Sequence, residues 1–147
     1  MPVDCSLLTQ WQQFTRAGVQ ASRSHQHLQP TALHRQALAI AQQLFAGQAN
    51  ASADDDRVAA FVVSHLNLAD AYIATDQRGA AVDCLCSAHG ELLATLQNAA
   101  LRASLRLAAG HHRRETHLAL IQFLAAHGPD PLVCQALARP IAPAQLH

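Results

Sequence analysis

Residues 65–88 of the chain read HLNLADAYIATDQRGAAVDCLCSA. Apolar residues recur there at helical spacing on both sides of the polar segment 76–79, at Leu68, Ala69 and Tyr72 and then at Ala81, Leu85 and Ala88. The pattern predicts two short helices that form a hairpin. Small Ala69 and Ala81 let the two backbones approach closely, while Tyr72 and Leu85 fill the space beside them. Such a hairpin cannot bury its apolar faces alone, so we expect it to stack on neighbouring hairpins.

Glycine and proline divide the rest of the chain into further helical lengths, and no segment shows the alternation of a strand. We expect helices at 6–22, 31–45, 57–75, 79–97, 98–109, 113–126 and 131–138, with Gly110 ending the fifth and Asp130 capping the last. The expected fold is all-α, with antiparallel hairpins stacked as a short solenoid of about three hairpins and six to seven helices. A single domain covers 1–139, and a short tail covers 140–147.

The spacing Leu68-Ala69-x-x-Tyr72, followed by Ala81-x-x-x-Leu85-x-x-Ala88, resembles the tetratricopeptide repeat family. His65 departs from that family, in which a large apolar residue is usual at this position. Moving the pattern along the chain identifies two candidate neighbouring repeats. A shift of 35 residues downstream selects Ala103, Ser104, Leu107, Thr116, Leu120 and Phe123. A shift of 51 residues upstream selects Phe14, Ala17, Gly18, Ala21 and Ala37, but it places Pro30 and His34 at positions that prefer apolar residues.

The resemblance implies a concave groove, lined by the first helix of each hairpin, that binds a peptide or protein segment. The residues that would line it are Val63, Leu66, Asn67, Asp70, Ile73, Arg102 and Arg106. Asn67 would hold a peptide backbone through an amide that both donates and accepts; the alternative is a solvated residue or a bond to a neighbouring hairpin. Arg102 and Arg106 would grip an acidic group of the partner, unless they are simply solvated.

Composition limits the other classes of function. The formal net charge is zero, with 10 basic and 10 acidic residues, which argues against nucleic-acid or membrane partners. There is no long apolar run, and the first residues lack the layout of a secretory signal, so we expect a cytoplasmic protein. No phosphate-binding loop or nucleophile motif is present, so neither an enzyme nor a cofactor is expected.

Ten histidines and four cysteines are the compositional oddity. No metal site is predicted, although Cys86 and His89 are the first candidates for one because they lie one helical turn apart. The pair His111 and His112 has no obvious third ligand in the sequence. The acidic run 54–56 is expected to cap a helix and complement its dipole, with a divalent-cation loop as the alternative.

The sequence therefore predicts a protein–protein interaction module whose partner is a peptide or protein of unknown identity. One alternative is a homo-oligomeric scaffold, because a short solenoid exposes apolar end faces. A third and less favoured reading is a metal-sensing or redox-sensing protein that uses its histidines and cysteines.

Overall fold

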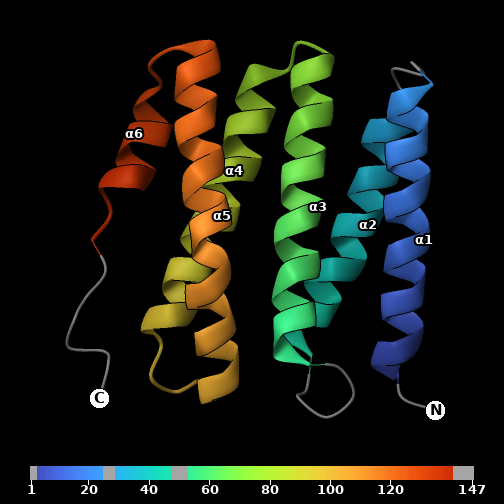
Figure 1. Ribbon diagram of the computed structural model, residues 1–147, viewed down its shortest axis with the longest axis vertical. Coiled ribbons are helices and arrows are strands. Elements are labelled where there is room, and N and C mark those ends of the chain that lie inside the picture. Colours follow the sequence, from blue (N-terminus) through green and yellow to red (C-terminus); the bar gives the residue numbers. More distant parts are fainter. Residues whose placement is uncertain (1–2, 25–28, 48–52, 141–147) are drawn as a thin grey trace.

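The computed structural model describes residues 3–24, 29–47 and 53–140, and in these ranges the chain is helical without strands. The helices are α1 (Val3–Arg23), α2 (Gln29–Ala46), α3 (Asp54–Ala74), α4 (Arg78–Gln97), α5 (Ala103–His127) and α6 (Pro131–Ala138). Neighbours in sequence are antiparallel and pack together, and α3 also packs against α5 (Figure 1). The predicted all-α stack of helix hairpins is confirmed. Its first helices, α1, α3 and α5, form the front layer of Figure 1, with α2 and α4 behind them.

The central hairpin, α3 and α4, packs as its spacing predicts. Leu68, Ala69, Tyr72, Ala81 and Leu85 are buried in one cluster, and Ala88 is buried in the adjoining one. His65 is buried as well. Its Nδ1 lies 2.8 Å from the carbonyl oxygen of Phe61, which satisfies the polar ring inside an apolar layer.

The interval between hairpins is 51 residues. A shift of that length carries the bounds of α1, 3 and 23, onto those of α3, 54 and 74. The same shift places Gly18 of α1, Ala69 of α3 and Leu120 of α5 at equivalent positions, and all three are buried. The upstream shift therefore relates buried positions of the two helices, although Ala17, its equivalent of Leu68, is exposed. His34, in the place of Leu85, lies so close to Gly18 that a Cβ on Gly18 would be 2.5 Å from the His34 ring.

The 35-residue register of the third repeat is wrong. All six residues that it selects lie in the single helix α5, and Leu107 among them is 76% exposed. The prediction failed because Gly110 does not end a helix. A Cβ at Gly110 would lie 3.2 Å from Leu96 Cδ1, so this glycine permits close packing of α5 on α4. The third hairpin is instead α5 with the short α6.

Side-chain contacts fix the start of α6 and hold the start of α4 against the end of α5. Asp130 caps α6 as predicted, because its Oδ1 accepts from the amides of Leu132 at 2.9 Å and Val133 at 3.2 Å. The Arg78 guanidinium donates to the carbonyl oxygen of His127 at 2.8 Å and lies over the Phe123 ring. These contacts join the start of α4 to the end of α5.

None of the helices in the described ranges has the length and apolar character that crossing a bilayer requires.

Candidate functional site

A cleft of about 270 Å³ lies between α3 and α5 and contains three of the predicted groove residues. Leu66, Asp70 and Ile73 line it from α3. From α5 and α4 it is lined by Leu85, Ala119, Gln122, Phe123, Ala126 and His127. The helical spacing on α3 therefore selected residues that share a real concavity.

Exposed apolar side chains also lie on α5, outside the lining of the cleft. Leu118 is 53% exposed and Ile121 is 45% exposed, although both are large and apolar. The 51-residue shift relates them to Asn67 and Asp70, so they occupy on α5 the places that these groove residues occupy on α3. We call Leu118 and Ile121 of α5, together with the lining of the cleft, the front surface.

The other predicted groove residues are placed differently. Val63 and Asn67 are half-buried on α3 and do not line the cleft. Arg102 immediately precedes α5, and its guanidinium donates two hydrogen bonds to Asp54, at 2.6 and 2.8 Å. Arg106 lies one turn further along, with its Nε 3.5 Å from the carbonyl oxygen of Leu96. The two arginines thus lie at the opposite end of α5 from the cleft.

That opposite end of the α3–α5 contact is polar. Asp54 is buried in the first turn of α3 and accepts hydrogen bonds from Arg102 and Ser104. Burial alone would raise its pKa, but the hydrogen bond from Arg102, the largest influence, holds the pKa below its usual value. Arg57 is fully buried beside Asp54 and donates to the carbonyl oxygen of Leu44 at 3.0 Å.

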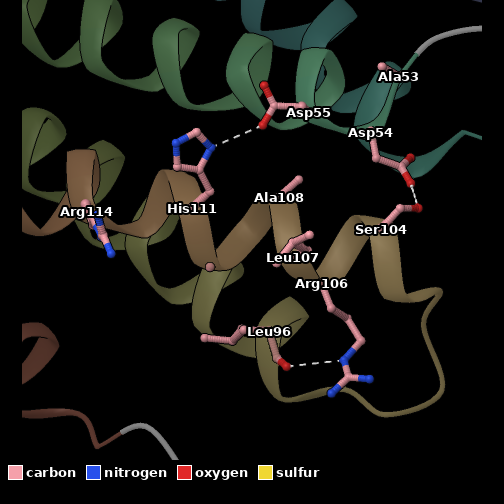
Figure 2. Close-up of a pocket in the computed structure, with 11 residues that line it drawn as sticks. Ala53, Asp54, Asp55, Leu96, Ser104, Arg106, Leu107, Ala108, His111 and Arg114 are labelled. Carbon is pink, nitrogen blue, oxygen red and sulfur yellow. Dashed lines mark hydrogen bonds and ion pairs between the residues drawn. The ribbon is translucent and has the colours of Figure 1, made fainter. Parts of the chain in front are cut away.

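The acidic run 54–56 lies in the first turn of α3, where it complements the helix dipole as predicted. The prediction that these side chains cap the helix is wrong, because the N-cap residue is Ala53 and no side chain bonds there. The carboxylates of Asp54 and Asp55 are instead turned toward α5 (Figure 2).

A larger, open pocket of about 730 Å³ surrounds this contact. Leu96, Leu107 and Ala108 give it an apolar surface, while Arg106 and Arg114 line it with positive charge. Figure 2 shows Asp54 meeting Ser104 and Asp55 meeting His111 across the gap between α3 and α5.

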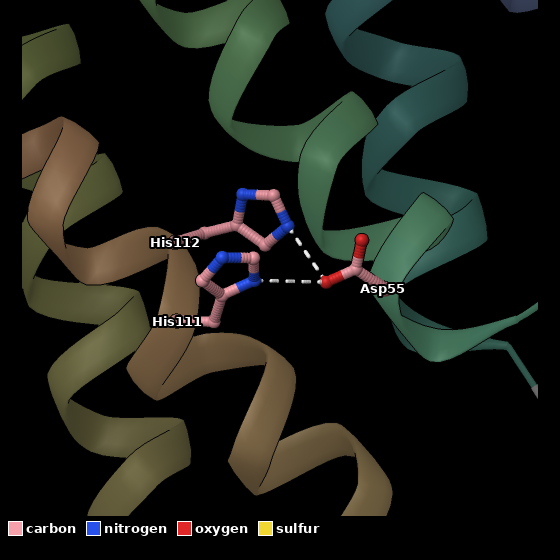
Figure 3. A group of neighbouring side chains, drawn as sticks. All are labelled: Asp55, His111 and His112. Carbon is pink, nitrogen blue, oxygen red and sulfur yellow. Dashed lines mark hydrogen bonds and ion pairs between the residues drawn. The ribbon is translucent and has the colours of Figure 1, made fainter.

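Asp55 also binds a second histidine. His111 Nδ1 lies 3.4 Å and His112 Nε2 lies 2.9 Å from the same oxygen, Asp55 Oδ1, as Figure 3 shows. Desolvation would raise the pKa of Asp55, but the hydrogen bonds from the two histidines outweigh it and lower the pKa. One potential ligand atom from each of these three residues lies within 4.8 Å of the other two.

The sequence favoured a different pair for metal binding, Cys86 and His89. His89 is buried, and its Nδ1 lies 2.8 Å from Thr116 Oγ1. Burial, with a smaller contribution from nearby His117, lowers the pKa of His89 to about 4. Burial also raises the pKa of the two thiols of α4, Cys84 and Cys86, that of Cys84 to about 11, so these cysteines are poor nucleophiles and pack against the core. The side chains of Cys5, His25, His27 and His147 lie outside the described residues.

Fold and surface together define a class: an all-α protein of stacked helix hairpins with large apolar side chains exposed on α5. A family model described as "Protein of unknown function (DUF2753)" matches residues 9–143, and the chain belongs to this family. No curated protein and no solved structure matches the chain significantly.

Sequence reasoning missed the cluster of Asp55 with His111 and His112. The adjacent histidines were a visible signal, but their partner lies more than 50 residues earlier in the chain. Only the packing of α5 on α3 brings the three side chains together.

Proposed function

We propose that this protein is a protein–protein interaction module that binds a peptide or protein segment on the front surface of α3 and α5. The observation that carries the proposal is the exposure of Leu118 and Ile121 on α5, the helix that also lines a largely apolar cleft against α3. Exposed apolar residues gathered beside a cavity are typical of binding sites, whereas single ones scattered on a surface are not.

The resemblance to tetratricopeptide repeat proteins supports the same interpretation, since that family binds its partners with the first helices of its hairpins. The longer interval of 51 residues departs from the family's usual repeat, so we propose a relationship in architecture and binding face. In this proposal Leu66, Ile73, Leu118 and Ile121 supply apolar contacts. Asn67 and Asp70 orient the backbone of the partner, and the protein acts in the cytoplasm as a binding protein and not as an enzyme.

The test uses peptides selected from a displayed library on the immobilised full-length protein. The selected pool is then measured by fluorescence anisotropy against Leu118→Asp and Ile121→Asp. We expect each variant to weaken binding at least tenfold, because a charge would have to be desolvated in an apolar contact.

Leu132→Asp is the matched control, because Leu132 is an equally exposed leucine that lies on a different helix, α6. It should bind the pool as the wild type does. Equal binding by all three variants would contradict the front surface as the binding site.

Self-association is the second candidate function, favoured by the same exposed apolar residues. Sedimentation velocity distinguishes it from partner binding. A dimer that dissociates on dilution and is abolished by Leu118→Asp, but not by Leu132→Asp, would make a second copy the partner. A monomer at every concentration would remove this alternative.

A further inference from the structure

We propose that Asp55, His111 and His112 form a binding site for one divalent transition-metal ion, with Zn²⁺ as the test ion. The site joins the first turn of α3 to the middle of α5 (Figure 3). It is separate from the front surface and does not depend on the proposed binding of a peptide.

The distances in the cluster suit a metal ion. Ligands about 2.0–2.1 Å from a zinc ion lie roughly 3.0–3.5 Å from one another in common coordination geometries. The distances from Asp55 Oδ1 to the two histidine nitrogens, 2.9 and 3.4 Å, fall close to this range. The two histidine nitrogens lie within 4.8 Å of each other, so rotation of the exposed His111 side chain toward His112 would complete the geometry around an ion.

The hydrogen-bond partners of His112 also support a metal site. Its Nδ1 lies 3.0 Å from Glu115 Oε1 and its Nε2 lies 2.9 Å from Asp55 Oδ1, so both ring nitrogens face carboxylates. A neutral imidazole carries one N–H proton and can donate to only one of them. In the metal-bound form that proton is donated to Glu115, and Nε2 exchanges its hydrogen bond with Asp55 for a bond to the cation between them.

Glu115 has the role of an outer partner in this arrangement. Metal-binding histidines commonly donate their second ring nitrogen to a carboxylate, which fixes the tautomer and the orientation of the ring. His112 is buried, which further restricts its ring, while Asp55 and His111 are exposed and leave a path for the ion. One ligand is thus fixed and two can close on the metal.

Charge and ligand type select the ion. The carboxylates of Asp55 and Glu115 together balance two positive charges, although Arg114 lines the adjoining pocket and opposes a cation. Two imidazoles with one carboxylate favour Zn²⁺ and similar first-row ions over Mg²⁺ and Ca²⁺, which prefer oxygen ligands. Three protein ligands also leave a coordination position for water or a small ligand.

The experiment is a calorimetric titration of the tag-free, chelator-treated full-length protein with ZnCl₂, and with MgCl₂ for comparison. We expect one zinc ion per chain and no binding of magnesium. Asp55→Asn and His111→Ala should each weaken zinc binding at least tenfold. Glu115→Gln should weaken it by about tenfold through the orientation of His112.

The matched controls are Asp56→Asn, an exposed aspartate in the same helical turn, and His117→Ala, another histidine of α5. Both should bind zinc as the wild type does. His111 is exposed, so its variant keeps the test valid even where replacing buried His112 impairs folding, which circular dichroism reports. No zinc binding by the wild type, or unchanged binding by the Asp55→Asn, His111→Ala double variant, would overturn the proposal.

Discussion

The contact between α3 and α5 has two chemically different ends. From the first turn of α3 across to the first half of α5 the contact is polar, with Asp54 bound to Arg102 and Asp55 bound to His111 and His112. Toward the end of both helices it is apolar, with Ala69 and Tyr72 in the same buried cluster as Leu120 and Phe123.

The difference shows two ways in which one helix pair is specified. The apolar end gains stability from burial, which is non-directional and depends on volume and area. The polar end gains it from directional contacts that compensate buried charge, so it fixes which groups face one another. Variants at the two ends should therefore differ in their dependence on pH.

The largest effect is expected at the apolar end. Leu120 is fully buried, so Leu120→Ala should lower the free energy of unfolding by about 4 kcal/mol through lost burial and a cavity. Urea denaturation at neutral and at mildly acidic pH measures it, and the loss should be the same at both. Leu118→Ala, two residues earlier and exposed, should change stability by less than about 0.5 kcal/mol. A loss of similar size in both variants would mean that α5 is rotated from the orientation described.

Acid should destabilise the middle of α5, where Thr116 contacts His89. The folded pKa of His89, about 4, lies below the ordinary histidine value of 6.5, so the folded protein favours the neutral ring. Its stabilising contribution is present above pH 6.5 and is lost as the pH falls toward 4, amounting to about 3 kcal/mol.

Thermal melts of wild type and His89→Gln between pH 7.5 and 4 measure this loss. The His89→Gln variant should lack this part of the pH dependence. The control His127→Gln, which replaces an exposed histidine at the end of α5, should retain it. Parallel pH profiles of wild type and His89→Gln would contradict the burial of a neutral ring.

A smaller effect is expected at the polar end. Asp54→Asn removes the carboxylate that pairs with half-exposed Arg102 and lies 4.0 Å from buried Arg57, which should cost about 2 kcal/mol at pH 7. Because the folded pKa of Asp54 is lowered from 3.8, the stabilisation is present above that pH and is lost as the pH falls below it. The difference between wild type and variant should therefore shrink below pH 3.8.

Urea denaturation across the pH range tests this expectation, with Asp56→Asn as the control in the same turn. A pH-independent difference would indicate a packing defect in place of a lost charge interaction.

The smallest effect is expected at Gly110, between the two ends of the contact. Gly110→Ala should stabilise the protein by about 0.5 kcal/mol, because alanine favours the helix by about 1 kcal/mol and half-buried Leu96 must yield slightly. Thermal denaturation checks it, with Gly79→Ala as the control, since nothing lies near that position. A loss of more than about 1 kcal/mol would mean that α5 cannot tolerate a Cβ where it crosses α4.

Much of the fold was predictable because the repeated apolar spacing is a local property. Leu68, Ala69 and Tyr72 lie on one helical face whatever surrounds them, and their burial follows. Gly110 misled the prediction because a glycine inside a helix and a glycine after a helix look alike in sequence. The distinction lies in Leu96 of α4, which contacts that position from another helix.

The site was predicted only in part, for the same reason. Leu66, Asp70 and Ile73 were identified from their shared face on α3, but the cleft exists because Ala119 and Ala126 of α5 lie opposite them. Leu118 and Ile121 became recognisable as the equivalents of the groove residues Asn67 and Asp70 only once the 51-residue interval was established.

The sequence by itself determined the helices of the central hairpin and the faces that they bury, since both follow from a periodicity within one segment. The tertiary structure alone decided which residue of α5 meets which residue of α3. Asp55 and His112 are 57 residues apart, and their contact depends on the lengths of three helices, the turns between them and the packing of their side chains. No local sequence pattern encodes the combined effect of these helix lengths, turns and packing contacts. The polar cluster therefore became visible only in the folded protein.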